Sequence, residues 1–228
     1  MSNNGTLTLI HGDKGGVGKS FVASVLIDSR LASGMKDQLI VVESDTRNPD
    51  VARLFLKHVR VENIDLKLHD GWMGLSDLLA DNPDKEIVVS LPAGIGHFVE
   101  EEAEYLSSVL KDLGHTLKVY WPINRLKDSI ILLKEFLSSP LSDLAQKIVV
   151  IQNGFFGEQR KFVRWIDSKT RKEFLSRPGA REAFLPELHE RVVDSITGPF
   201  SMAEGLKYSE KTELERWTRE AYAAVLGG

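Results

Sequence analysis

The sequence predicts an α/β fold, a single domain over residues 1–228 with a mostly parallel sheet and helices on both faces. Short runs rich in valine, isoleucine and leucine alternate with helical patterns along the chain. These runs are nearly continuous in apolar residues, which is typical of strands buried on both faces. A glycine-rich loop joins the first run to the first helical pattern. With 42% hydrophobic residues, the 228-residue chain can form one sizeable core.

Five apolar runs are the strand candidates, and they lie at residues 6–11, 39–44, 86–91, 116–121 and 147–152. Helical patterns occur between them, at residues 19–33, 49–58, 99–113 and 126–138. Residues 61–69 are a weaker strand candidate. After residue 153 the pattern is mostly helical, and a long helix is expected from about Ser209. This alternation of strand and helix predicts a parallel sheet, because parallel neighbours need a crossover connection.

Composition excludes several classes of site and protein. The chain has no cysteine, so disulfides, thiolate metal sites, iron–sulfur ligation and cysteine nucleophiles are excluded. The N-terminus lacks the pattern of a signal peptide, and no apolar run approaches the roughly 18 residues that span a bilayer. We therefore expect a cytoplasmic protein that does not act at a membrane. The net charge of −4 argues against a wholly basic nucleic-acid binder.

The loop HGDKGGVGKS, residues 11–20, carries the strongest functional signal. Its glycines would let backbone N–H groups converge on phosphate oxygens, and the following helix adds the positive end of its dipole. In such a loop Lys19 contacts the β- and γ-phosphates, and the Ser20 hydroxyl binds Mg²⁺. The sequence thus predicts ATP and Mg²⁺ as cofactors, with contacts from Gly15, Gly16, Val17, Gly18, Lys19, Ser20 and Phe21.

This loop departs from the strict P-loop pattern, because Asp13 stands at the position of the first glycine. With the extra lysine Lys14, the sequence xKGGxGK[ST] resembles the deviant Walker A loop of the ParA/MinD ATPase family. The resemblance implies a P-loop NTPase fold and a homodimer formed with ATP, in which Lys14 reaches the facing subunit's nucleotide. A second cation there would stabilise charge developing on the γ-phosphate. The alternative is that Lys14 is a solvated loop lysine.

Two acidic residues follow the second strand candidate in the segment VVESDTRNPDV. Glu43 and Asp45 occupy the positions of two acids in the ParA/MinD family. The resemblance implies that Asp45 orients the attacking water and that both carboxylates lie near the metal. Asp45 is also suited to cap the helix after Pro49, although Asn48 is better placed to do so.

The third strand candidate continues into EIVVSLPAGIG, which resembles the family's Walker B and switch II segment. Ser90 occupies the position of the family's aspartate. Serine carries no charge and holds a metal-bound water only through a neutral hydrogen bond, which is weaker than a charge-assisted one. Either Glu43 and Asp45 supply the missing charge, or metal binding and turnover are weakened. Gly94 and Gly96 still allow this loop to move with the γ-phosphate.

Two later segments are candidates for the base-binding part of the site. Asn153 matches an asparagine that reads the adenine edge in the family, although asparagine before glycine is also a common turn former. The segment FLPELHERVV, residues 184–193, resembles a family segment that packs against the base. The resemblance places Pro186 and Glu187 beside adenine, and it extends over about residues 6–193.

A basic segment lies in the C-terminal third of the chain. Residues 158–182 contain eight lysines and arginines and four acids, so the segment carries +4 and the remainder −8. If it is helical, Arg160, Arg164 and Arg171 share one face, which would suit weak, non-specific contact with DNA phosphates. A solvated basic face and a docking site for an acidic protein are the alternatives.

The C-terminal helical pattern has an apolar stripe of Leu214, Trp217, Ala221 and Val225. Its polar face is mainly acidic, and anionic lipids would repel it. We therefore expect this helix to pack on the domain.

Together these features indicate a ParA-like protein of plasmid partition or of plasmid transfer and mobilisation. We expect it to dimerise on ATP, to hydrolyse ATP slowly, and to act through a protein partner, either an adaptor or a transfer protein. Two alternatives remain. One is a nucleotide-binding module with little or no hydrolysis, suggested by Ser90, and the other is a metabolic P-loop enzyme that uses ATP on a small acid.

Overall fold

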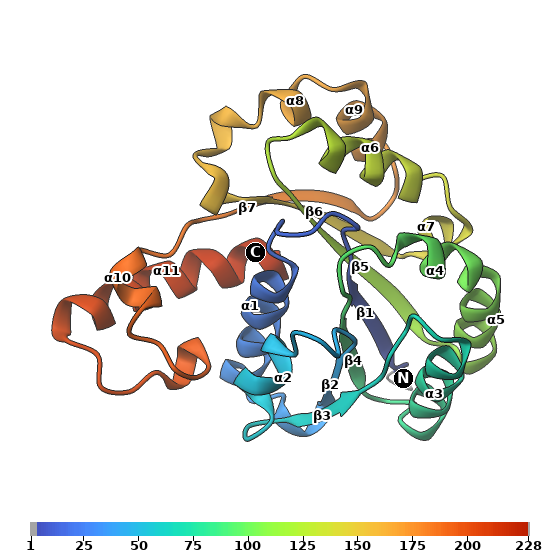
Figure 1. Ribbon diagram of the computed structural model, residues 1–228, viewed down its shortest axis with the longest axis horizontal. Coiled ribbons are helices and arrows are strands. Elements are labelled where there is room, and N and C mark those ends of the chain that lie inside the picture. Colours follow the sequence, from blue (N-terminus) through green and yellow to red (C-terminus); the bar gives the residue numbers. More distant parts are fainter. Residues whose placement is uncertain (1–3, 228) are drawn as a thin grey trace.

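The computed structural model describes residues 4–227, and within them it shows one seven-stranded sheet whose paired strands are all parallel (Figure 1). The order across the sheet is β3-β2-β4-β1-β5-β6-β7. The predicted α/β fold with a parallel sheet is confirmed. The strands are β1 Thr6–Ile10, β2 Leu39–Glu43, β3 Arg60–Asn63, β4 Glu86–Ser90, β5 Thr116–Ile123, β6 Lys147–Asn153 and β7 Ala180–Leu185.

Helices cover both faces of the sheet. One face carries α1 Lys19–Ala32, α2 Asp50–Phe55, α10 Glu190–Val193 and α11 Tyr208–Leu226. The other carries α3 His69–Asp81, α4 Gly96–Glu101, α5 Ala103–Leu113, α6 Lys127–Phe136, α7 Pro140–Leu144, α8 Val163–Ile166 and α9 Lys169–Leu175. Each layer of helices buries its own hydrophobic cluster against the sheet, so the molecule has three layers (Figure 1).

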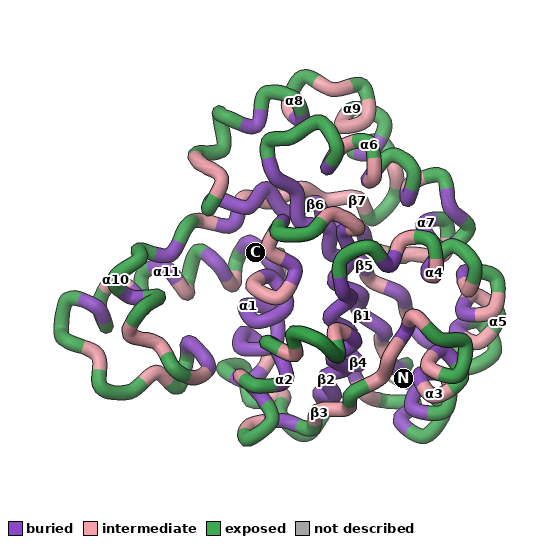
Figure 2. The backbone as a smooth tube through the Cα atoms, viewed as in Figure 1, coloured by how far each residue is buried: buried purple, intermediate pink, exposed green. Residues whose placement is uncertain are grey.

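Strands β2 and β4 are buried along their whole length, and β1 is buried except at its first residue (Figure 2). Side chains of a strand alternate between faces, so Leu7 and Leu9 of β1 join one cluster and Ile10 joins the other. Burial on both sides explains why β2 and β4 read as continuous apolar runs.

Helix α3 and strand β7 are among the elements that were not predicted from the sequence. Helix α3 contains Gly71 and Gly74, which lower helical propensity, yet it buries Trp72 and Leu75 in the core. Strand β7 is an edge strand with arginine and glutamate among its half-buried residues, so it lacks the apolar run of a central strand.

One predicted helix and one segment considered as a helix are not continuous in the structure. The pattern at 99–113 is divided at Glu102 into α4 and α5. The basic segment forms a 3₁₀ turn at Gln159–Lys161 and two short helices, with breaks at Phe162 and at residues 167–168. Phe162 and Trp165 are buried in the core.

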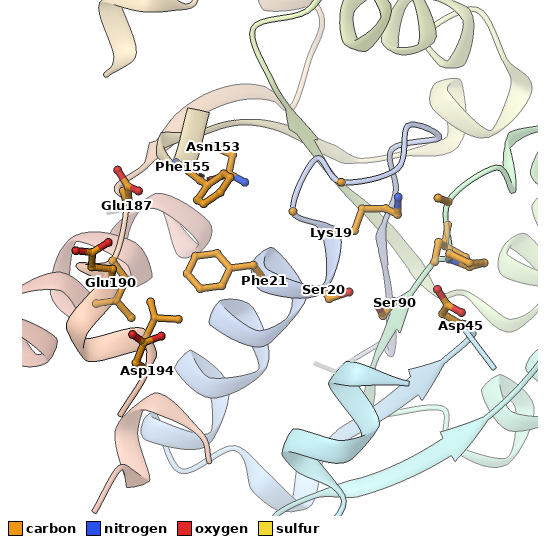
Figure 3. Close-up of a pocket in the computed structure, with 17 residues that line it drawn as sticks. Lys19, Ser20, Phe21, Asp45, Ser90, Asn153, Phe155, Glu187, Glu190 and Asp194 are labelled. Atoms are coloured by element: carbon orange, nitrogen blue, oxygen red, sulfur yellow. Dashed lines mark hydrogen bonds between the residues drawn. The ribbon is translucent and has the colours of Figure 1, made fainter. Parts of the chain in front are cut away.

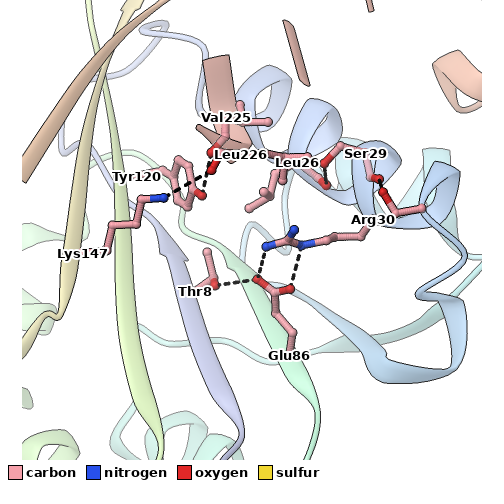
Figure 4. Close-up of polar contacts among 10 residues, drawn as sticks. Thr8, Leu26, Ser29, Arg30, Glu86, Tyr120, Lys147, Val225 and Leu226 are labelled. Carbon is pink, nitrogen blue, oxygen red and sulfur yellow. Dashed lines mark hydrogen bonds and ion pairs between the residues drawn. The ribbon is translucent and has the colours of Figure 1, made fainter. Parts of the chain in front are cut away.

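Helix α11 packs on the sheet layer as expected, and its predicted apolar stripe is buried. The hydroxyl group of Tyr120 in β5 donates to the carbonyl of Val225 at 2.8 Å, and the Lys147 ammonium of β6 donates to the carbonyl of Leu226 at 3.3 Å (Figure 4). Of the helices within residues 4–227, none combines the length and the apolar character needed to cross a bilayer.

The strand order determines where a site can form. Strand β1 lies between β4 and β5, so the chain leaves it towards one edge of the sheet and later returns to its other side. In parallel sheets, a ligand site commonly forms at such a point, beyond the carboxyl ends of the strands. The loops that follow β1, β2, β4 and β6 meet at this edge.

Candidate nucleotide-binding site

A cavity of about 530 Å³ opens at the carboxyl edge of the sheet (Figure 3). Lys19, Ser20, Asp45 and Ser90 line one end, and Figure 3 shows Phe21 between that end and the other. The far end is formed by residues of the chain after β6 and around α10: Asn153, Phe155, Glu187, Leu188, Glu190, Val193 and Asp194. The cavity therefore has a polar end beside the glycine loop and an end with apolar walls and an acidic rim.

The glycine loop has the backbone shape of an anion cradle. Gly16 and Gly18 have φ values of 72° and 98°, a region that favours glycine. A Cβ atom on Gly18 would also lie 2.2 Å from Nδ2 of Asn153, so a larger residue cannot fit without movement. Gly18 is the N-cap of α1, and no side chain of the described residues caps it. The first amides of α1 are thus left for an anion.

Lys19 lies at the wall of the cavity and is 8% exposed. Its Nζ donates to the carbonyl of Gly12 at 2.7 Å and to that of Lys14 at 3.1 Å. Burial lowers the pKa of Lys19 from 10.5 to about 8, and the charges of Asp13 and Asp45 oppose this shift. A bound phosphate would supply the negative charge that this buried ammonium lacks.

Lys14 takes no part in this cavity. Its Nζ lies 2.6 Å from Oδ2 of Asp128, in the first turn of α6, and this ion pair holds the pKa of Asp128 below its usual value. The two lysines of the loop therefore have different surroundings, since Lys19 lines the cavity and Lys14 lies outside it.

Asp45 lines the cavity, whereas Glu43 is engaged by the backbone. Oδ1 of Asp45 accepts the N–H groups of Arg47 at 3.2 Å and Asn48 at 3.0 Å, which fixes the turn after β2. Glu43 is buried and accepts three backbone N–H groups, from Asp45, Val51 and Ala52.

Glu43 thus caps the first turn of α2, a role for which the sequence suggested only Asp45 and Asn48. Burial raises the pKa of Glu43, and its three hydrogen bonds oppose that shift. Both carboxylate oxygens of Glu43 accept backbone N–H groups, and Glu43 does not line the cavity, so its role at a metal stays a prediction.

Ser90 ends β4 and lines the polar end of the cavity, where Figure 3 shows it between Ser20 and Asp45. Asp13 stands where the P-loop pattern has its first glycine, and the structure gives it a role that the sequence did not indicate. Its carboxylate accepts the N–H group of Gly96 at 2.7 Å, and its carbonyl accepts that of Gly94 at 2.9 Å. Asp13 therefore ties the glycine loop to the loop after β4.

At the far end, Asn153 and Glu187 line the cavity as expected, and Pro186 does not. The amide of Asn153 is already hydrogen-bonded within the protein: Nδ2 donates to Val17 at 2.9 Å and Oδ1 accepts from Phe155 at 3.1 Å. The carbonyl of Pro186 accepts the indole N–H of Trp217 at 2.8 Å, which joins this segment to α11.

Five residues at this end were not identified from the sequence: Phe155, Leu188, Glu190, Val193 and Asp194. Phe155 follows the Asn-Gly turn and is 69% exposed, which is an unusual position for a large aromatic side chain. The other four lie in or next to the FLPELHERVV segment, and an adenine-packing role for that segment could have suggested them.

These residues fit a nucleoside triphosphate. The glycine cradle, the uncapped helix and Lys19 suit phosphates, and the apolar walls near Phe21 and Phe155 suit a base. Ser20 and Asp45 line the polar end and are the residues that could bind Mg²⁺ beside the phosphates. Within residues 4–227 no group of three His, Asp or Glu side chains could hold a metal alone, so the ion would depend on phosphate oxygens.

The three arginines predicted to share one face are not on a common helix. Arg160 pairs with Glu158 at 2.6 Å, and Arg164 donates to the carbonyl of Arg125 at 3.1 Å. Arg171 makes two bonds to Glu182, at 2.8 and 2.5 Å, and therefore holds α9 to β7. The predicted common face is wrong, because the helix is interrupted at Phe162 and at residues 167–168, so the three arginines lie on separate elements.

No protein-family model matches the chain. Protein MobD of Acidithiobacillus ferrooxidans is 36% identical over 227 residues, and the match covers 97% of both chains. The chain belongs to the MobD family. Identity at this level over nearly the full length extends the family relationship to both the glycine loop and the far end of the cavity.

Solved structures confirm the fold of this MobD-family protein. The ParA protein of pNOB8, bound to nonspecific DNA, has a TM-score of 0.52 at 11% identity and covers 97% of each chain. MinD of Aquifex aeolicus has a TM-score of 0.51 at 16% identity and covers 96% of this chain and 93% of its own. The predicted ParA/MinD-type fold is confirmed, and identities this low support the fold alone.

Proposed function

We propose that this MobD-family protein binds ATP with Mg²⁺, pairs with a second copy of itself in the ATP-bound state, and acts in plasmid mobilisation or partition. The observation that carries the proposal is that the two lysines of the glycine loop lie in different places. Lys19 lines the cavity, and Lys14 lies outside it on an exposed ion pair that can be exchanged. The name of the MobD relative and the DNA-bound ParA structure support the mobilisation and DNA parts of the proposal.

The glycine loop and three residues of the polar end have roles in this proposal. The loop amides and Lys19 bind the triphosphate, the Ser20 hydroxyl holds the metal ion, and Asp45 orients the attacking water. Lys14 leaves Asp128 and binds the nucleotide of the facing subunit. The bound metal neutralises charge on the phosphates, and the protein supplies position and a shielded site.

Light scattering after size-exclusion chromatography tests the dimer. Wild type should be monomeric without nucleotide and dimeric with saturating ATP and Mg²⁺. Lys14→Ala should stay monomeric with ATP while it binds nucleotide within about twofold of wild type, because Lys14 does not line its own cavity. Lys36→Ala, which removes an exposed lysine elsewhere, is the control. A wild-type protein that remains monomeric would remove the dimer from the proposal.

A second candidate function is a nucleotide-binding module with little hydrolysis. Ser90 favours it, since this neutral side chain lines the polar end of the cavity. We expect Ser90→Asp to accelerate single-turnover hydrolysis by about tenfold or more if charge at this position limits the reaction. An unchanged rate would indicate that wild type is already a competent ATPase, and the module hypothesis would be lost.

DNA contact is the part of the proposal that depends on the basic segment. Arg160 and Arg164 are exposed and suit phosphates, whereas Arg171 is occupied by Glu182. A mobility-shift titration at two salt concentrations should show weak, salt-sensitive binding that Arg160→Glu and Arg164→Glu reduce. If neither change affects binding, the segment is not the DNA surface.

The proposal also includes a protein partner, either an adaptor or a transfer protein.

A further inference from the structure

A second cavity, of about 190 Å³, lies between the start of the glycine loop, α4 and α6. It shares no lining residue with the nucleotide cavity. Asp13 lines it from the loop, Glu100 from α4 and Glu135 from α6, while His11 and Trp121 form part of its inner wall. No role proposed above uses this cavity.

The inner wall is aromatic. Trp121 and Phe136 stack with ring centroids 4.9 Å apart and an interplanar angle of 25°. The ring of His11 meets both edge-on, with centroids at 4.6 Å from Trp121 and 5.3 Å from Phe136. Rings in this arrangement offer π faces and edges to a group that enters the cavity.

His11 supplies a polar atom without a partner. Its side chain is 3% exposed and lines the cavity, and its Nδ1 is buried with no hydrogen-bond partner among the described residues. Burial, with the nearby charge of Lys19, lowers the pKa of His11 to about 3, so the ring is neutral and one nitrogen can accept a hydrogen bond. An orphaned buried nitrogen is costly, and a ligand that donates to it would remove that cost.

The mouth of the cavity is acidic. Asp13, Glu100 and Glu135 contribute three carboxylates, and no lysine or arginine lines the cavity. In the part of the chain that the structure describes, none of the three forms an ion pair with a basic side chain, whereas Glu101 next to them pairs with His97 at 3.2 Å. The cavity thus attracts a cation.

A metal ion is not the cation that these residues suit. Within residues 4–227 no three His, Asp or Glu side chains are close enough to hold one. The aromatic wall and the neutral histidine suit instead an organic cation with N–H donors and an apolar stem. The volume of about 190 Å³ accommodates a single such group.

We propose that this cavity binds an alkylguanidinium or alkylammonium group. Its N–H donors reach His11 beside the rings of Trp121 and Phe136, its charge is balanced by Glu100, Glu135 and Asp13, and its stem leads out through the mouth. The group can come from an arginine side chain of a partner protein or from a small free amine. Because Asp13 also holds Gly96, the occupant contacts both loops that border the nucleotide cavity.

Calorimetric titration of the nucleotide-free protein tests this site with three probes. They are N-acetylargininamide, its neutral analogue N-acetylcitrullinamide, and agmatine. We expect the arginine probe to bind at least about tenfold more tightly than the citrulline probe, since only it carries the charge. Binding of the blocked arginine at least as tight as that of agmatine would indicate a protein side chain, and the reverse order would indicate a free amine.

Variants of the lining glutamates test whether the probes bind in this cavity. Glu100→Gln with Glu135→Gln should weaken the arginine probe by about tenfold, while Glu104→Gln, an exposed glutamate on α5 outside the cavity, should leave it unchanged. Circular dichroism verifies that the variants are folded. No saturable binding of either cationic probe below about 10 mM, or equal binding of the neutral analogue, overturns the proposal. The test needs no nucleotide, so its result is independent of the proposed ATP switch.

Discussion

Lys19 is the residue whose chemistry most constrains nucleotide binding. Its ammonium is buried against loop carbonyls, and this burial lowers the pKa to about 8. Above that pH the free protein loses the proton, and below it the ammonium stays charged without a full counter-charge. A triphosphate bound at the cavity would reverse the shift, because an adjacent opposite charge favours the protonated form.

Nucleotide binding near pH 9 should therefore take up close to one proton, and affinity should fall by up to about tenfold per pH unit above pH 8. Calorimetry in two buffers with different ionisation enthalpies measures the uptake. Lys19→Arg should abolish it, since arginine stays charged, and Lys14→Ala should retain it because Lys14 lies outside the cavity. Binding without proton uptake at pH 9 would show that Lys19 is not the ligand of the phosphates.

At this scale, the sequence predicted the polar end of the cavity better than the far end. Lys19 and Ser20 follow from a short local pattern, since neighbouring residues of one loop form the cradle. Phe155 and Val193 come together only through the fold, and no local pattern connects them. Glu43 shows a different limit, because an acid at the end of a buried strand can serve backbone amides as well as a metal.

Among the contacts between elements, the ion pair of Arg30 in α1 with Glu86 in β4 is well shielded from water (Figure 4). The side chains are 18% and 9% exposed, and Nε of Arg30 lies 2.8 Å from Oε2 of Glu86. Thr8 of β1 donates to the same carboxylate at 3.1 Å. The group thus connects α1 to two adjacent strands.

Glu86→Gln should lower the free energy of unfolding by about 3 kcal/mol, because it leaves the Arg30 guanidinium buried without a counter-charge. Glu213→Gln, which breaks the more exposed pair with Arg216 on α11, should cost about 0.5 kcal/mol or less. Urea unfolding followed by circular dichroism measures both. Equal losses in the two variants would mean that shielding of the Arg30 pair has no energetic effect.

The elements that were predicted correctly are those with one strong, uninterrupted apolar pattern. Helix α11 has an apolar stripe at helical spacing, the central strands have continuous apolar runs, and the bounds of both differ from the prediction by a few residues. Helix α3 was missed although Trp72, Leu75 and Leu79 recur at helical spacing, because two glycines interrupt the pattern. Strand β7 owes its place to pairing with β6, and pairing partners far apart in the chain are not visible in a local window.

On the scale of the whole molecule, the sheet order brings the glycine loop and the start of α6 to the same edge. Lys14 and Asp128 are 114 residues apart in sequence and meet there at 2.6 Å. In the proposed dimer, Lys14 must leave Asp128 before it reaches the facing subunit. The ion pair between Lys14 and Asp128 therefore stabilises the monomer relative to the proposed dimer.

Asp128→Ala should lower the ATP concentration at half-maximal dimerisation by about two- to fivefold, the range expected when an exposed ion pair no longer has to be broken. Sedimentation velocity across an ATP titration measures the midpoint at fixed protein concentration. Asp143→Ala removes the partner of Arg177 in another exposed pair and should leave the midpoint unchanged. A midpoint that rises in Asp128→Ala would mean that Asp128 supports Lys14 in the dimer, and the release of this ion pair would not be a step of the switch.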